Sequence, residues 1–333
     1  MTPRPRAAIV GVSGPRLTAE ETALFRAAPP LGAILFARNV VDPDQLRALN
    51  AELRDLLGAE APILVDQEGG RVARLRPPHW PAFAPAAAFS GGPAEVARAH
   101  AALLGLACAG VGFDVVCAPV LDLRLPGAHD IIGDRSFGAD PAEVARLGLA
   151  TIEGLQEAGC IPVIKHIPGH GRALADSHFE LPRVAASRDD LALDCAPFAA
   201  LAGAGAWAMT AHILYEALDA ARPATLSPAV IARVIRGAIG FEGVLVSDDL
   251  CMKALRGDPG ALAAEAIDAG CDLVLHCSGV LEETAACLAG CPALSKGAVA
   301  RLEAARGAML ARRRPLDPVT LAATRDAWLV QAA

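Results

Sequence analysis

Three of the chain's eight histidines lie in one fifteen-residue stretch, residues 164–178, which reads IKHIPGHGRALADSH. Within it, Asp176 stands two residues before His178. A carboxylate at this spacing in a loop can accept the imidazole N–H, which fixes the tautomer and the orientation of the ring. An unperturbed imidazole has a pKa of about 6.5 and can therefore both donate and retrieve a proton. The pair indicates general acid–base chemistry, although an aspartate turn cap beside an exposed histidine gives the same pattern.

The same stretch offers two other chemistries, and the residues favour neither of them. His166 and His170 have the four-residue spacing of a helical zinc pair. Pro168 and Gly169 stand between them and disfavour a helix, so we expect no metal ligands here. Ser177 lies in no GxSxG turn and follows no apolar run, which argues against a serine nucleophile.

Further ionisable residues directly follow apolar runs elsewhere in the chain. They are Asp66 after PILV, Lys165 and His166 after PVI, His212 shortly after WAMT, and Asp248 and Asp249 shortly after GVLV. Any one of them could be a loop ion pair or a helix cap. If the runs are parallel strands, however, all of these residues lie at one rim of the sheet, where such folds carry their chemistry.

Eight short apolar runs are candidates for those strands. They are 7–12, 32–36, 62–65, 113–118, 162–165, 207–210, 243–246 and 273–275. Strands that are apolar throughout are buried on both faces, as in a parallel sheet.

Amphipathic or alanine-rich segments separate these runs and predict helices. They are 18–28, 43–57, 93–109, 141–158, 191–202, 228–235, 259–269 and 281–289. Several begin with a capping residue before proline, such as Asp42-Pro43 and Asp140-Pro141. Eight alternating units predict an α/β fold, a single (β/α)8 TIM-type barrel with a long flexible loop after strand 5. An open doubly wound sheet is the alternative.

Composition narrows the domain organisation and the partners. No linker or change of composition divides the chain, so residues 1–333 are expected to form a single catalytic domain, with residues 300–333 as closing helices. The net charge of -7 gives no basic surface for nucleic acid or for an anionic membrane. Nine cysteines without a CxxC pair predict free thiols and a cytoplasmic protein. Residues 195–215 lack charge, but Pro197 and Gly203 favour a buried helix end, a turn and a strand over a membrane span.

Taken together, KHIPGHG, DSH and SDDL resemble motifs of glycoside hydrolase family 3, and in particular of its NagZ-type β-N-acetylglucosaminidases of bacterial cell-wall recycling. The family pattern K-H-F-P-G-H-G has a phenylalanine where this chain has Ile167, an apolar exchange. The resemblance extends in order from about residue 8 to residue 280. It includes the stretches GAILFARN (32–39), VDQEGGRV (65–72), APVLDL (118–123), IGDRSFG (132–138), MTAHI (209–213) and ATLSP (224–228).

The resemblance implies a covalent, retaining mechanism without metal or cofactor. It makes Asp248 the nucleophile, His178 the acid/base and Asp176 the partner of His178. It assigns sugar binding to Asp66, Arg74, Arg135, Lys165 and His166. Adjacent strand residues point to opposite sides, so Asp248 and Asp249 are not both expected to face the sugar, and the choice of Asp248 comes from the resemblance.

The implied activity is the removal of terminal β-1,4-linked GlcNAc from GlcNAc-1,6-anhydro-MurNAc and its peptides by a monomeric exo-glycosidase. The glycine-containing loop 167–178 is expected to be mobile and to bring His178 to the substrate. Two alternatives remain at this point. A phosphorylase of the same linkage is one, since a histidine acid/base would not repel phosphate. A non-catalytic sugar-binding module is the other.

Overall fold

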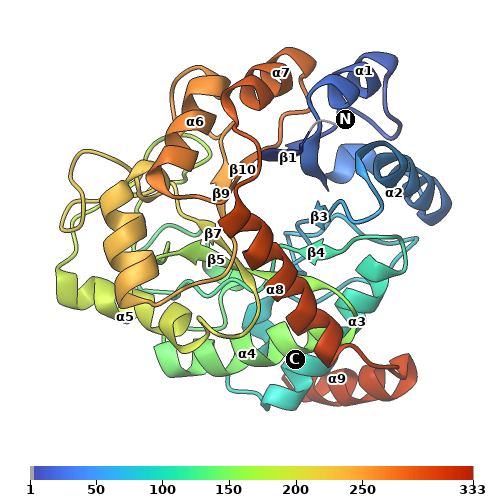
Figure 1. The fold of residues 1–333 in the computed structure, drawn as a ribbon. Coiled ribbons are helices and arrows are strands. Elements are labelled where there is room, and N and C mark those ends of the chain that lie inside the picture. The colour runs from blue at the N-terminus through green and yellow to red at the C-terminus, as the bar shows by residue number, and fades with distance from the viewer. Residues whose placement is uncertain (1–3, 333) are drawn as a thin grey trace.

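The computed structural model describes residues 4–332 and shows eight parallel strands closed into a barrel (Figure 1). Around the barrel their order is β1-β10-β9-β7-β5-β4-β3-β2. Their bounds are β1 Arg6–Gly11, β2 Pro30–Leu35, β3 Ile63–Val65, β4 Val115–Val116, β5 Ile161–Ile167, β7 Trp207–Thr210, β9 Leu245–Asp249 and β10 Leu273–His276. Each of the eight apolar runs contributes one strand, which confirms the predicted (β/α)8 barrel and excludes the open sheet.

Helices surround the strands (Figure 1) and agree closely with the predicted segments. They are α1 Ala19–Ala27, α2 Pro43–Leu57, α3 Ala94–Ala109, α4 Pro141–Glu157, α5 Arg188–Ala200, α6 Pro259–Ala269 and α7 Leu281–Gly290, with a π-helix, η5, at Val230–Ala238. The side chains of Asp42 and Asp140 cap α2 and α4 as expected, each with proline at the start of the helix. The helix predicted at 228–235 extends three residues further because Ile239 N–H bonds to the carbonyl of Val234.

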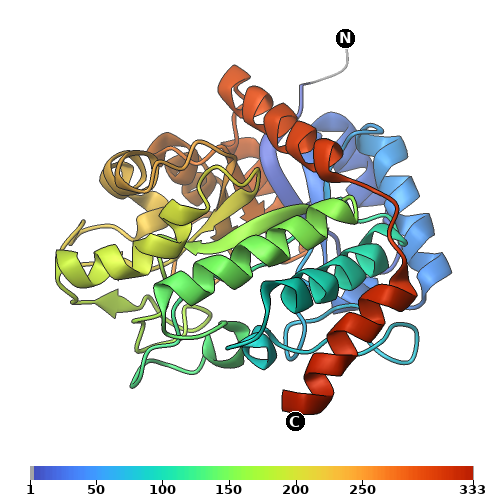
Figure 2. The ribbon, with the colours of Figure 1, turned by 90° about the horizontal axis from the view of Figure 1, so that it is seen from below.

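The two closing helices are α8, at Lys296–Arg312, and α9, at Pro318–Ala332. Helix α8 lies across the barrel in Figure 1, and its Ala305 and Met309 pack into a buried cluster with Ile161 and Trp207, which begin β5 and β7. It therefore covers the mouth formed by the amino ends of the strands. Figure 2 shows α9 beside α3, where the Trp328 indole donates to the carbonyl of Ala88 at 2.9 Å.

A small two-stranded sheet was not predicted. Strand β6, Arg183–Val184, lies in the segment that joins β5 to α5 and pairs in parallel with β8, Leu214–Tyr215. Two-residue strands are too short for a periodic pattern in sequence. The Tyr215 hydroxyl also donates to the carbonyl of Gly169 at 2.7 Å, which ties the base of the predicted mobile loop to this sheet.

The uncharged segment 195–215 forms the end of α5, a turn, and β7, as predicted. Among the helices of residues 4–332, none is long and apolar enough to cross a membrane. The nine cysteines are all free thiols, and most are buried. A disulfide framework is therefore absent, as the sequence predicted.

Candidate active site

A cavity of about 290 Å³ lies at the carboxyl ends of the strands, opposite the mouth that α8 covers. Every predicted site residue except Asp176 lines it: Asp66, Arg74, Arg135, Lys165, His166, His178 and Asp248. Asp176 does not line the cavity, but its Oδ1 lies 2.7 Å from Nδ1 of His178. The cavity is at the small end of the range typical of pockets for small molecules. The barrel thus brings together residues that are up to 182 positions apart, from Asp66 to Asp248.

Asp248 lies at the end of β9 and borders the cavity. One of its carboxylate oxygens accepts the N–H of Asp249 at 2.8 Å. Burial alone would raise the pKa of the Asp248 carboxyl, but His212, His166 and the Asp249 N–H together hold it below its usual value. Asp248 is therefore an ionised carboxylate at neutral pH, as a nucleophile must be.

Asp249 borders the same cavity as Asp248, but its carboxylate is engaged by the protein backbone. The difference from Asp248 lies in its partners. Its Oδ1 accepts the N–H groups of Cys251 and Cys277, both at 3.0 Å. Asp249 therefore holds the segment after β9 against the end of β10, whereas the Asp248 side chain has only the one short backbone contact.

Asp176 and His178 form the predicted pair. Asp176 Oδ1 lies 2.7 Å from His178 Nδ1 and accepts the backbone N–H of the same histidine at 2.8 Å. Although burial opposes it, these two contacts lower the pKa of the Asp176 carboxyl. The His178 side chain is 58% exposed, while that of Asp176 is 15% exposed. The pair is thus formed, with Nε2 of the imidazole left for a substrate.

A buried network of charges occupies the other side of the cavity. Lys165 Nζ lies 2.8 Å from Asp66 and 2.6 Å from Glu68, and Arg74 lies 3.4 Å from Asp66. Two guanidinium nitrogens of Arg135 donate hydrogen bonds to the Glu68 carboxylate, at 2.8 and 2.9 Å. Despite burial, Lys165 and Arg74 lower the pKa of the Asp66 carboxyl, and Arg135 and Lys165 lower that of Glu68. Both carboxyl groups are therefore ionised at neutral pH.

Glu68 was missed in the sequence analysis, although it stands within the VDQEGGRV stretch that had been noted. Asp122, in APVLDL, was missed as well. It is fully buried, accepts the N–H groups of His166 and His170, and lies 2.7 Å from His166 Nδ1. An acid within an apolar stretch was the signal that could have identified Asp122, because a buried carboxylate needs partners.

His170 and His212 are structural in their contacts. Burial and the neighbouring His166 lower the pKa of His170 to about 4, so it is neutral at pH 7. His212 is fully buried and bonds to Thr225 at 2.7 Å and to the Asp249 carbonyl at 3.0 Å. Burial lowers its pKa too. Since Asp122 holds both His166 and His170 through their backbone, the two do not form a helical metal pair.

An ionised carboxylate and a carboxylate-supported imidazole border one cavity at the carboxyl mouth of a (β/α)8 barrel. This combination is typical of a (β/α)8-barrel enzyme, whose reactive residues lie at the carboxyl ends of the strands. Comparison with known families gives the particular assignment. The Glycosyl hydrolase family 3 N terminal domain matches residues 11–305, so the chain belongs to glycosyl hydrolase family 3 and is a glycoside hydrolase.

Relatives over most of the chain are β-hexosaminidases by name. One from Alkalilimnicola ehrlichii is 42% identical over 285 residues, which cover 81% of this chain and 80% of the relative. One from Pseudomonas aeruginosa is 37% identical over 334 residues, which cover 97% of this chain and 98% of the relative. Among solved structures, NagZ from Neisseria gonorrhoeae in complex with N-trifluoroacetyl-D-glucosamine matches with a TM-score of 0.85 at 31% identity and covers 99% of both chains.

Proposed function

We propose that the protein is a β-hexosaminidase, and specifically a retaining exo-β-N-acetylglucosaminidase. Its proposed substrates are GlcNAc-1,6-anhydro-MurNAc and the corresponding muropeptides, from which it removes the terminal β-1,4-linked GlcNAc. The observation that carries the proposal is that Asp248 borders the same cavity as His178, whose imidazole is paired with Asp176. The names of the curated relatives and the glucosamine derivative bound to the Neisseria gonorrhoeae enzyme support the choice of sugar.

In the first step, Asp248 attacks the anomeric carbon while His178 donates its proton to the glycosidic oxygen. The bond to the leaving sugar breaks, and a glycosyl ester of Asp248 remains. In the second step, His178 takes a proton from water, which attacks the anomeric carbon and releases Asp248. Two displacements at one carbon restore the β configuration. Asp176 accepts a hydrogen bond from Nδ1–H of His178 and so keeps Nε2 as the atom that exchanges the catalytic proton.

The sugar is held by Asp66, Arg74, Arg135, Lys165 and His166 in this proposal. Asp66 is ionised and accepts hydrogen bonds from hydroxyl groups, while the three cationic side chains donate. A substrate that lacks one of these hydroxyl groups would leave a desolvated charge without its partner. Such sites discriminate strongly against analogues that lack the group.

Movement of the loop 167–178 belongs to the proposed mechanism, because more than half of the His178 side chain faces solvent in this structure. Proton transfer requires His178 within hydrogen-bond distance of the leaving oxygen. Hydrogen exchange measured with and without ligand tests this step. Equal protection of the loop in both states would contradict it.

Trapping with a 2-acetamido-5-fluoro glycosyl fluoride tests the proposed function directly. This reagent forms the covalent intermediate quickly and hydrolyses it slowly, so a label is expected on the peptide that contains Asp248. The Asp248→Ala variant serves as the control and should take up no label. A label on any other residue would overturn the assignment of the nucleophile.

Phosphorolysis of the same linkage is the second candidate. An imidazole acid/base lacks the negative charge of a carboxylate and so does not repel an incoming phosphate. Product analysis in phosphate buffer separates the two reactions. Free GlcNAc is expected from hydrolysis, and GlcNAc-1-phosphate would establish the phosphorylase.

The proposal also includes the setting of the reaction. We propose a monomer of one catalytic domain that acts in the cytoplasm without a metal or cofactor in the reaction. The free state of all nine cysteines supports a reducing compartment. Light scattering of the purified protein tests the monomer, and full activity in the presence of a chelator is the expected result for the reaction.

A further inference from the structure

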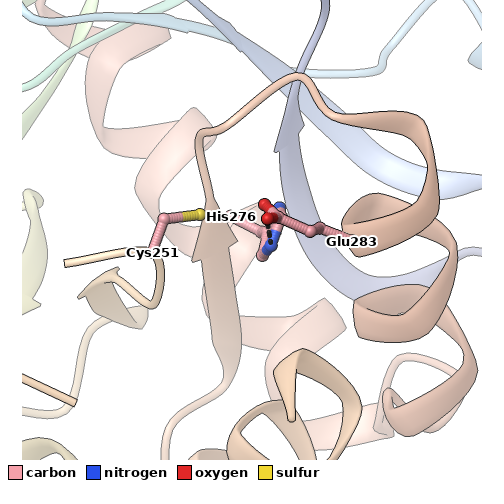
Figure 3. A group of neighbouring side chains, drawn as sticks. All are labelled: Cys251, His276 and Glu283. Carbon is pink, nitrogen blue, oxygen red and sulfur yellow. Dashed lines mark ion pairs between the residues drawn. The ribbon is translucent and has the colours of Figure 1, made fainter. Parts of the chain in front are cut away.

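Three potential metal ligands gather behind the rim of the barrel, outside the catalytic cavity. Figure 3 shows Cys251 from the segment after β9, His276 from the end of β10 and Glu283 from the first turn of α7. One ligand atom of each lies within 4.8 Å of the others. None of the three lines the cavity that holds Asp248 and His178. In residues 4–332 this is the only group of three such side chains found at that separation.

His276 is the buried member of the group, and one of its ring nitrogens lacks a hydrogen-bond partner among the described residues. It is 1% exposed, and its Nδ1 makes no hydrogen bond in the described structure. Its Nε2 is 4.0 Å from the Glu283 carboxylate, which is too far for a hydrogen bond. Burying a polar ring without a partner costs free energy, so such atoms in native proteins usually have a protein, water or metal partner.

The Asp249 carboxylate holds Cys251 close to His276. Asp249 Oδ1 accepts the N–H groups of Cys251 and Cys277 together, and Cys277 follows His276 directly in the chain. The end of β9 and the end of β10 are thus connected by a single carboxylate. Glu283 is the adjustable member, since its side chain is 47% exposed.

We propose that Cys251, His276 and Glu283 form a binding site for a divalent cation of the zinc type. A thiolate, an imidazole and a carboxylate are the ligand set that Zn²⁺ prefers, whereas Mg²⁺ and Ca²⁺ take oxygen ligands alone. Zinc bonds of about 2.0–2.3 Å place the ligand atoms of a tetrahedron roughly 3.3–3.8 Å apart. Rotation of the exposed Glu283 side chain closes the remaining gap, and water completes the four ligands.

The surrounding charges suit a cation. The Glu283 carboxylate belongs to the site, and the Asp249 carboxylate lies beside Cys251. Burial and Asp249 raise the pKa of the Cys251 thiol to about 12, so the free protein carries a thiol here at neutral pH. A bound cation displaces this proton and coordinates the thiolate, as metals do at cysteine ligands.

The ion would connect β9, β10 and α7 near the rim. Its nearest link to catalysis is the chain itself, because Cys251 stands three residues after Asp248. A cation that binds only the native state stabilises it, so Zn²⁺ should raise the midpoint of thermal unfolding. This inference does not depend on the proposed sugar or on the proposed mechanism.

Cobalt(II) is the probe that tests the ligand set. Thiolate coordination to Co²⁺ gives a charge-transfer band in the near ultraviolet, which oxygen and nitrogen ligands alone do not give. Reduced wild-type protein should bind one equivalent of Co²⁺ with this band. The Cys251→Ser variant should lose the band. Cys195→Ser is the matched control, because Cys195 and Cys251 are the two cysteines that are not buried and Cys195 lies on α5. This variant should keep the band.

Glu283→Gln provides a second variant at an exposed position. It should weaken Co²⁺ binding by more than the roughly tenfold that loss of an outer-shell partner costs. A band that survives in Cys251→Ser, or wild-type protein without a band, would overturn the proposal. Metal binding that persists in Cys251→Ser but disappears in His178→Ala would place the ion in the catalytic cavity and overturn it as well.

Discussion

The two sides of the catalytic cavity differ in how their charges are held. On one side, Asp66, Glu68, Arg135 and Lys165 neutralise one another, and the Lys165 and Glu68 side chains are only 3% and 6% exposed. On the other side, His178 is 58% exposed and depends on a single carboxylate in its own loop. The buried side is fixed before substrate arrives, whereas the exposed side remains free to move. Binding and proton transfer are therefore supported by regions of different rigidity.

The largest effect should come from Asp248→Ala, which removes the proposed nucleophile between these two sides. Loss of a group that forms the covalent intermediate should lower kcat by at least about 10⁴-fold, measured with a chromogenic GlcNAc glycoside. Added azide should restore part of the turnover and yield the α-glycosyl azide, because a single displacement inverts the anomeric centre. Recovery of a β-linked product would show that another carboxylate is the nucleophile.

The exposed side is tested by His178→Ala. General acid catalysis contributes about 10²–10⁴-fold, so kcat on substrates with a sugar leaving group should fall by that factor. Activated aryl glycosides need little protonation, and their cleavage step should change far less. The control is Lys165→Met on the buried side, which should impair both kinds of substrate alike. If His178→Ala lowered kcat equally on both kinds of substrate, the assignment of His178 as the acid/base would be wrong.

The difference in rigidity predicts unequal effects on stability for one chemical change. Glu68→Gln leaves Arg135 and Lys165 as buried like charges and should lower the free energy of unfolding by about 3–5 kcal/mol. Asp176→Asn alters a partly exposed pair and should cost no more than about 1 kcal/mol. Denaturant unfolding of both variants measures the contrast. Similar losses of unfolding free energy in the two variants would mean that the two sides of the cavity do not differ in rigidity.

The Glu68 contribution to stability should also depend on pH. Arg135 and Lys165 hold the pKa of folded Glu68 below that of an unfolded glutamate, about 4.3, despite burial. The unfolded chain therefore takes up a proton first as pH falls. The stability that Glu68 provides is complete above the unfolded pKa of about 4.3. It should decrease by about 1.4 kcal/mol for each pH unit below that value. The stability difference between wild type and Glu68→Gln should shrink accordingly, and a constant difference would contradict the pKa shift.

The sequence was sufficient for most of the barrel because its signals are local. Buried parallel strands are apolar throughout, and Asp-Pro steps mark helix starts. It was insufficient for β6 and β8, whose two residues each carry no period. The spacing of Asp176 and His178 predicted a hydrogen bond because both lie in one short loop. The pairing of Glu68 with Arg135, 67 residues apart, exists only after the barrel closes.

Asp122 shows the same limit more clearly. Asp122 is buried by strands and helices that come from the whole chain. A single acid within APVLDL therefore does not show which residues it will contact. The Cys251, His276 and Glu283 group likewise joins three elements without a sequence motif. The role of Asp248 rather than Asp249 came from the resemblance alone, and the backbone contacts of Asp249 provide an independent physical reason for it.

Buried apolar side chains fill the inside of the barrel, and this has a kinetic consequence. Because no passage runs through the barrel, substrate and products share the opening at the carboxyl ends of the strands, and in the proposed exo-reaction the hexosamine sits deepest. The aglycone therefore has to depart before the attacking water can enter, and the bound monosaccharide leaves last. Free GlcNAc should accordingly compete with substrate for the empty enzyme, and an acceptor alcohol should intercept the sugar ester only after the first product has gone.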